Sequence, residues 1–132
     1  MSPKKVETRL TQPGEGRGRR QVAEKYLEVA NLIDSEDGTA INVCVGVAVL
    51  SGIAAADAIS AAALGERSTG QDHADAAEVL GRVDPKLAKQ LRDIITLKSA
   101  SHYGFGLLSP AQRKTALRCA TALVAEARLR QP

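Results

Sequence analysis

One acidic and several basic side chains lie where helical periodicity would bring them together. Asp57 is the only charge in an apolar run of 24 residues. Lys98, His102 and His73 fall on the expected inward lines of neighbouring helical segments, and Arg67 lies shortly after the apolar run. A buried carboxylate is costly unless a cation meets it, so we expect these groups to converge. The cluster could bind phosphate, with a histidine as general base towards a ribose hydroxyl.

A purely structural interpretation of the same residues remains open. Asp57 could pair with Lys98 or His73 and simply fix the packing of three helices. Tyr103 could close the end of the bundle as an aromatic plug. His102, near a helix C-terminus, would be favoured there as a cation by the helix dipole.

The composition indicates an all-α domain. The chain has 132 residues, with 44% hydrophobic and 25% charged side chains, which suits one globular domain. Aromatic residues make up only 2%, whereas alanine occurs 22 times. Alanine is the best helix former, and sheets are built mainly from β-branched and aromatic residues. We therefore expect a single bundle of closely packed helices.

Apolar spacing and stop signals predict two long helices in the first half of the chain. The first follows residue 20 and ends before Gly38. Its expected buried stripe consists of Val22, Tyr26, Val29 and Ile33. The second covers residues 39–64 and stops at Gly65. Its expected inward line, shared with Asp57, consists of Leu50, Ile53, Ala61 and Leu64.

Capping patterns predict three further helices, so that the whole domain is a five-helix up-and-down bundle. The three start patterns are Thr69 with Asp72, Asp84 with Pro85, and Ser109 with Pro110 and Gln112. The fourth helix is expected to stop at Gly104.

The ends of the chain are basic and its middle is acidic. Residues 1–20 and residues 111–132 each carry a net charge of +4, and the residues between them carry −5. Residues 1–20 combine proline, glycine and charge without an apolar face, so we predict a disordered or extended, flexible basic arm before a bundle of residues 21–132. Such a tail could also bind phosphate backbones.

Residues 41–64 are long enough to cross a bilayer. Recurring polar residues, among them Asp57, and the weak hydrophobicity of alanine favour instead a buried helix in a soluble bundle. Cys44 and Cys119 stand alone in apolar patterns, which favours reduced thiols in a cytoplasmic protein. We recognise no metal-ligand spacing, glycine-rich phosphate loop or secretory leader, and we expect no metal, cofactor or membrane contact.

Five segments within residues 21–128 follow the order of a known family's helices. They are VAEKYLEVANLI, SGIAAADAISAAAL, GQDHADAAEVL, LRDIITLKSASHYG and SPAQRKTALRCATALVAEA. The pattern resembles the HEPN domains (higher eukaryotes and prokaryotes nucleotide-binding), with an acidic residue in a long alanine-rich second helix and an aromatic residue that ends the fourth. The resemblance implies a five-helix bundle that usually forms a homodimer.

The resemblance also implies a chemistry. Family nucleases use an arginine and a histidine with four to six residues between them, and Arg67 and His73 enclose five. They would be the catalytic residues of a metal-independent endoribonuclease, although Ser68 stands where those nucleases usually have Asn, Asp or His. The remaining expected binding residues are Asp57, Lys98, His102 and Tyr103.

Two function hypotheses follow. The first is a protein that binds RNA or a nucleotide, with or without cleavage, as the HEPN half of a toxin-antitoxin type pair whose partner protein is a nucleotidyltransferase. The second is a non-enzymatic helical module that dimerises or docks a partner through an alanine-rich face.

Overall fold

The computed structural model describes residues 6–33, 35–69, 73–103 and 106–132, with backbone alone at residues 100–103. It contains five helices, α1 (Glu15–Leu32), α2 (Gly38–Leu64), α3 (His73–Gly81), α4 (Pro85–Tyr103) and α5 (Pro110–Arg130). Two short strands, β1 (Thr8–Leu10) and β2 (Glu66–Ser68), form an antiparallel pair. The predicted five-helix, all-α bundle is confirmed, with this small ribbon as an unpredicted addition.

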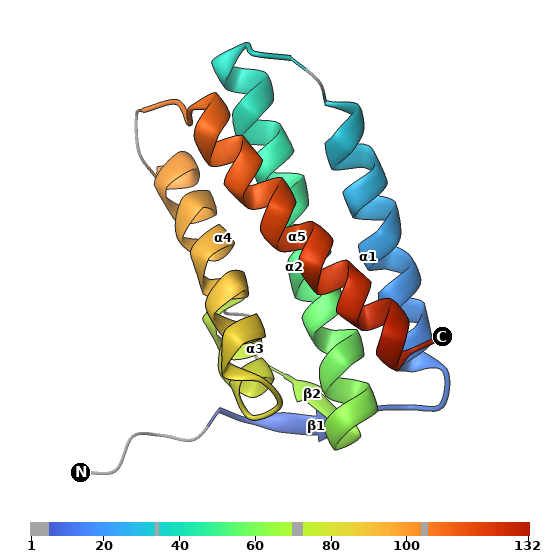
Figure 1. Ribbon diagram of the computed structural model, residues 1–132. Helices are drawn as coiled ribbons and strands as arrows, with labels where there is room; N and C mark the ends of the chain where they lie inside the picture. The colour runs from blue at the N-terminus through green and yellow to red at the C-terminus, as the bar shows by residue number, and fades with distance from the viewer. Residues whose placement is uncertain (1–5, 34, 70–72, 104–105) are drawn as a thin grey trace, which may run out of the picture.

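The four long helices lie side by side, and the short elements gather at one end of the bundle (Figure 1). Helix α2 is central, because α1, α3, α4 and α5 all pack against it. Helix α3 pairs with α4, and the β1–β2 ribbon crosses the end of α2 near α3. The start of α1 and the end of α5 meet at this same end (Figure 1).

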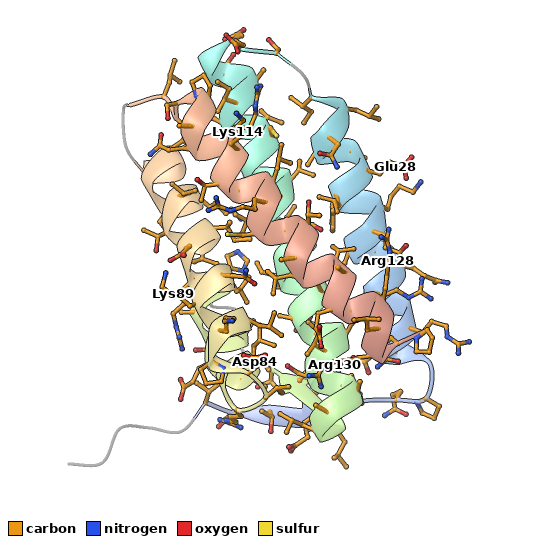
Figure 2. All side chains as sticks on the ribbon, in the orientation of Figure 1. Glu28, Asp84, Lys89, Lys114, Arg128 and Arg130 are labelled. Carbon is orange, nitrogen blue, oxygen red and sulfur yellow. The ribbon has the colours of Figure 1, made fainter. Side chains whose placement is uncertain are left out.

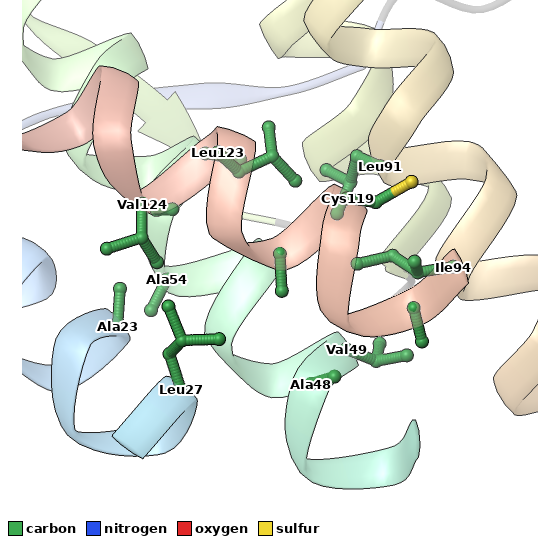
Figure 3. Packing of buried hydrophobic residues seen from close by; sticks show 14 of the residues in the cluster. Ala23, Leu27, Ala48, Val49, Ala54, Leu91, Ile94, Cys119, Leu123 and Val124 are labelled. Atoms are coloured by element: carbon green, nitrogen blue, oxygen red, sulfur yellow. The ribbon is translucent and has the colours of Figure 1, made fainter. Parts of the chain in front are cut away.

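Small and branched apolar side chains form the core between α1, α2, α4 and α5 (Figure 3). Fully buried members include Ala23, Ala48, Val49, Ala54, Leu91, Ile94, Leu123 and Val124. Ser51, a buried polar residue of α2, is bonded to backbone, since its Oγ donates to Ala23 O at 2.7 Å. Alanine and serine therefore allow α1 and α2 to approach closely.

Gly52 marks a tight approach of α2 to its neighbours. A Cβ atom there would lie 2.7 Å from Ile94 Cδ1, 3.2 Å from Leu91 Cδ1 and 3.3 Å from Leu123 Cδ1. Glycine in a helix interior costs roughly 0.5–1 kcal/mol relative to alanine. Here the missing side chain is what lets α4 and α5 pack onto α2.

Most predicted helix boundaries agree with the structure. The Asp84 carboxylate accepts from the Lys86 backbone N–H at 2.9 Å, and the capping box of Ser109 with Gln112 is present. Gly65 ends α2 in the left-handed conformation, with φ 68°. The predicted box of Thr69 with Asp72 and the stop at Gly104 involve residues outside those described. Gly38 begins α2, after the Asp37 N-cap, and the prediction that it ends α1 is wrong.

The predicted buried stripe of α1 is wrong at Val22 and Val29, while Ile33 packs against the core as expected. Val22 and Val29 are 38% and 40% exposed, whereas Ala23, Leu27 and Ala30 face the core. Both sets have helical spacing, and the set with smaller side chains is the one that lets α1 approach α2 closely. Val22 and Val29 are larger than alanine and stand too far out for this contact.

The prediction of a flexible arm over residues 1–20 needs correction for residues 6–20. Residues 8–10 form β1, and α1 begins at Glu15, ahead of the expected boundary at residue 21. Arg82 also donates to the Val6 carbonyl at 3.2 Å. Strand pairing and ion pairs, which local composition does not encode, order this part of the chain.

Helix α2 meets the length and composition criteria of a membrane span, and it is the one helix among the described residues that does. More than half of its most apolar stretch, 56%, is buried within the bundle. Its location confirms the prediction of a buried central helix.

Candidate functional site

Asp57 is buried on α2, with only 7% of its side chain exposed. The other residues of its expected inward line are less buried than it is. Leu64 is 36% exposed, and Leu50, Ile53 and Ala61 are partly buried. The prediction that this line faces the core is wrong for Leu64, while Ile53 packs against the core and the burial of Asp57 is confirmed. Segments from elsewhere in the chain must therefore cover the carboxylate.

Two arginines from outside α2 meet Asp57 at one oxygen. Arg19 of α1 places Nε and Nη2 each 3.1 Å from Asp57 Oδ2. Arg67 of β2 donates from Nη1 to the same oxygen at 2.9 Å. These two, rather than Lys98 or His73, are its ion-pair partners within the described part of the chain. The expected meeting of a buried acid with bases from separate segments is confirmed, with Arg19 as an unpredicted member.

The electrostatics of Asp57 are a balance of burial and charge. Burial raises the pKa of its carboxyl above the ordinary value, and the nearby charges of Arg19 and Arg67 counteract that rise. Desolvation disfavours a carboxylate, while an adjacent cation favours it. Both arginines therefore help to keep the buried acid ionised.

A second carboxylate, Glu15, extends the cluster. Arg67 Nε lies 2.6 Å from Glu15 Oε2, as an ion pair without hydrogen-bond alignment. Arg9 donates to both Glu15 oxygens, at 3.1 Å and 2.5 Å. Bonding to Arg9, then to the Gln12 backbone N–H, lowers the pKa of Glu15 to about 2. We call Arg9, Glu15, Arg19, Asp57 and Arg67 the ion network.

The β1–β2 ribbon positions Arg9 and Arg67, two of the three arginines of the ion network. Arg9 and Arg67 are directly opposite each other in its register. Like charges at opposed positions repel, and Glu15, bound by both, offsets this repulsion. Thr8 Oγ1 donates to Glu66 Oε1 at 3.0 Å and adds a second link between the strands. The ribbon thus carries Arg67 over the end of α2, where it reaches Asp57.

His73 and Lys98 form a separate contact between α3 and α4. Lys98 Nζ lies 3.3 Å from His73 Nε2, and both side chains are partly buried. An ammonium group can only donate, so a hydrogen bond at this contact requires an unprotonated Nε2. The structure therefore holds one cation and one imidazole together between α3 and α4.

The predicted site residues divide into two groups. Asp57 and Arg67 are joined in the ion network, and His73 and Lys98 are joined between α3 and α4. The proposed catalytic residues Arg67 and His73 thus belong to different groups. His102 and Tyr103 are at positions whose side chains are not described, so their predicted binding roles stay predictions.

The ion network limits what Arg67 can do chemically. Its guanidinium is 26% exposed and is shared between two carboxylates. In total, three arginines face two acids, which leaves a net charge of +1. An arginine held in this way orders its surroundings, and it would have to leave Asp57 or Glu15 to stabilise a reacting phosphate.

Metal and thiol chemistry find little support in the described residues. Within them, no three His, Cys, Asp or Glu side chains gather as metal ligands would. Cys44 and Cys119 are buried, and burial raises the pKa of both thiols. Thiols of this kind react slowly.

Sequence reasoning missed Arg9, Glu15 and Arg19, which were assigned to a flexible arm. One local signal was present, because an acid at position 15 followed by periodic alanines and leucines is typical of a helix start. The contacts themselves include pairs 38 and 58 positions apart, and no short motif encodes them.

No protein-family model and no curated protein matches this chain. The likeness to HEPN domains therefore rests on the five sequence segments and their order.

Proposed function

We propose that this chain is a HEPN-like protein that binds a phosphate of a nucleotide or of RNA beside His73 and Lys98. The observation that carries the proposal is the 3.3 Å contact between Lys98 Nζ and His73 Nε2. It joins the start of α3 to α4 with a lysine ammonium and an imidazole. An ammonium is a strong point donor to phosphate oxygens, and imidazole titrates near neutral pH.

The same pair has the components of acid–base chemistry on a ribose hydroxyl. Once a substrate phosphate draws Lys98 away from His73, Nε2 could take the hydroxyl proton while the Lys98 ammonium stabilises the charge on the phosphate. Cleavage of RNA without a metal is thus an extension of the binding proposal. The ion pairs of Arg67 with Asp57 and Glu15 support binding more than cleavage, because they occupy the second proposed catalytic residue.

The biological setting in this proposal is a cytoplasmic homodimer that acts with a nucleotidyltransferase as a toxin-antitoxin type pair. The two isolated, buried cysteines support a reducing compartment. The pairing and the partner protein rest on the HEPN resemblance alone.

Calorimetric titration with nucleoside monophosphates tests the binding proposal. We expect His73→Ala and Lys98→Ala each to weaken binding at least tenfold, roughly the 1.4 kcal/mol of one charged hydrogen bond. Lys86→Ala, an exposed lysine at the start of the same helix as Lys98, is the matched control and should bind as the wild type does. Absence of binding in the wild type, or equal affinity in all four proteins, would refute the proposal.

Cleavage is tested separately. RNA is incubated with wild-type protein or His73→Ala in the presence of EDTA. Faster loss of intact RNA with the wild type supports a metal-independent endoribonuclease. Equal RNA integrity with the two proteins would support a protein that binds RNA without cleaving it.

A second candidate function is a non-enzymatic module that pairs with another copy or docks a partner. Outward apolar residues on α1 and α2 favour it, since Val29, Leu32 and Val43 are 40%, 76% and 57% exposed. A Cβ atom added at Gly46, in α2, would meet nothing from the rest of the fold within 4 Å, so a foreign helix could approach closely there. Light scattering measures the oligomeric state of the wild type and of Val29→Glu. A stable wild-type dimer that becomes monomeric in Val29→Glu, in a protein that binds no nucleotide, supports this function.

A further inference from the structure

The exposed side of α5 carries charge of one sign over most of its length. Residues 110–125 contain Arg113, Lys114 and Arg118 and no acidic side chain. The helix as a whole has five basic residues and one acid, Glu126. Surface helices of soluble proteins usually mix both signs along one face. The pattern on α5 therefore differs from that of an ordinary solvated helix.

Lys114, Arg118 and Arg128 share one face of α5, and we call them the basic stripe. Their spacing of four and ten residues, with exposed Thr121 and Ala125 between them, keeps the same side of a 3.6-residue helix turned outward. From Lys114 to Arg128 the stripe is about 21 Å long at 1.5 Å per residue. All three side chains belong to exposed residues.

The first part of the basic stripe does not stabilise its own helix, whereas Arg128, in the last turn of α5, is placed favourably. The first turn of α5 has no acidic residue, and Arg113 and Lys114 lie near its positive end. Cations are unfavourable at a helix N-terminus, and like charges four residues apart, as in Lys114 and Arg118, repel. Arg128, which pairs with Glu24 at 3.1 Å, is still 58% exposed. An anion from outside the chain would relieve these repulsions.

The adjacent helix α4 adds one lysine beside the stripe. Lys89 of α4 is 76% exposed and pairs with Asp93 at 3.1 Å, and the charges of Lys89, Asp93 and Arg118 all act on the Cys119 thiol. Figure 2 shows Lys114, Arg128 and Arg130 along α5, with Lys89 on the adjacent α4. The basic surface therefore spans two helices on the side of the bundle that α5 forms.

We propose that the basic stripe of α5, with Lys89 beside it, binds the phosphate backbone of single-stranded RNA. A stripe of about 21 Å with three cations can neutralise about three backbone phosphates. Its residues are long, exposed cations with no base-reading aromatic among them, so binding is electrostatic and independent of sequence. This surface extends the proposed function from one phosphate to a strand, and it does not need His73 or Lys98.

An anionic membrane is the competing polyanion, and the apolar content of the face decides against it. Between Lys114 and Arg128 the outward positions include Thr121 and Ala125, and the large exposed apolar residue Leu129 lies beyond the stripe. Helices that lie on membranes bury a broad face of large apolar side chains. Such a face is absent from the described surface of α5.

The test is fluorescence anisotropy with a labelled single-stranded RNA of about 20 nucleotides, titrated at several salt concentrations. The variant is the double charge reversal Lys114→Glu, Arg118→Glu. The matched control is Lys25→Glu, Lys86→Glu, which changes net charge equally at exposed positions of α1 and α4. Circular dichroism melting of each protein shows whether it is folded.

We expect the α5 variant to bind the RNA at least tenfold more weakly than the control. Its slope of log Kd against log salt should fall by about 1.4, since each lost phosphate contact of a single strand accounts for about 0.7. Equal weakening in variant and control, or no weakening, would overturn the proposal. So would tighter binding to equimolar phosphatidylserine–phosphatidylcholine vesicles than to RNA.

The same RNA and a nucleoside monophosphate, titrated into His73→Ala, separate this inference from the proposed function. Loss of monophosphate binding with RNA affinity retained supports both. RNA binding that depends on the basic stripe, in a protein that binds no monophosphate, supports the stripe and refutes the site at His73. Loss of all RNA binding in His73→Ala would overturn the stripe as an independent surface.

Discussion

Around Gly52, α2 meets α4 and α5 through apolar side chains, whereas around Asp57 it meets α1 and β2 through ion pairs. The two levels are five residues apart on one helix. The first is filled by the ends of three branched side chains. The second buries a carboxylate and covers it with two arginines.

The difference shows that one apolar, alanine-rich helix is held by packing around Gly52 and by ion pairs around Asp57. Close approach at Gly52 gives dispersion contacts at the core density of proteins. At Asp57 the charge costs desolvation, and the arginines offset that cost only while both are in place. The free energy of unfolding should therefore fall when a larger side chain is placed at Gly52, and also when a charge is removed around Asp57.

The largest effect is expected at the ionic level. Arg67→Ala removes a partner from both Asp57 and Glu15, and loss of one partner from a buried ion pair typically costs about 3–5 kcal/mol. Because Arg67 is 26% exposed and Arg19 still binds Asp57, we expect a loss of about 2–3 kcal/mol. Urea unfolding monitored by circular dichroism measures it.

Arg17→Ala is the control for this prediction, because Arg17 is an exposed arginine of α1 outside the ion network. Its change should stay within about 0.5 kcal/mol. If Arg67→Ala were no more destabilising than Arg17→Ala, the ion network would make no contribution to folding.

A somewhat smaller effect is expected at the apolar level. Gly52→Leu places a side chain where even a Cβ would meet Ile94, Leu91 and Leu123 within 3.3 Å. Overpacking of this kind typically costs about 1–3 kcal/mol, and we expect about 2 kcal/mol in the same urea assay.

Gly46→Ala sharpens that result, because Gly46 lies on the same helix with open space around it. Alanine there should raise the free energy of unfolding by up to about 1 kcal/mol through helix propensity. Destabilisation by both substitutions would mean that packing against α4 and α5 is not what requires glycine at position 52.

The smallest effect concerns pH and Glu15 of the ion network. Glu15 has a folded-state pKa of about 2 against an ordinary 4.5. A lowered carboxyl pKa contributes stability that is present above pH 4.5 and is lost as the pH falls towards 2. Asp57 has the opposite effect on the pH dependence of stability. Because its pKa is raised in the folded state, protonation of its carboxyl favours folding.

Glu15→Gln should therefore flatten the fall of unfolding free energy between pH 4.5 and pH 2. Glu36→Gln, at an exposed position of the loop before α2, is the comparison that should keep the wild-type slope. If unfolding free energy fell equally steeply with pH in the wild type and in Glu15→Gln, Glu15 would be excluded as the source of the loss of stability at low pH.

Local signals predicted the helices, and their success has a physical reason. The caps at Asp84 and Ser109 and the stop at Gly65 act on backbone groups a few residues away, so sequence alone carries them. The buried face of α1 was harder to predict. Val22 and Val29 look more apolar than Ala23 and Ala30, yet close helix contact selects the smaller side chains.

The candidate site was predictable only in part. Burial of Asp57 followed from its apolar surroundings, and a compensating base followed from the cost of an unpaired charge. The identity of the basic residues that pair with Asp57 depends on the β1–β2 register and on where α1 begins. Contacts between distant segments set both of these features. Contacts at such separations leave no periodic trace in the sequence.

The early start of α1 changes how the chain can be dissected. A fragment cut at residue 21, where composition alone places the boundary, would lose Arg9, Glu15 and Arg19 in one step and leave the carboxylate of α2 with Arg67 as its remaining counter-ion among the described residues. Deletions meant to probe a loose tail would in practice probe the interior of the bundle.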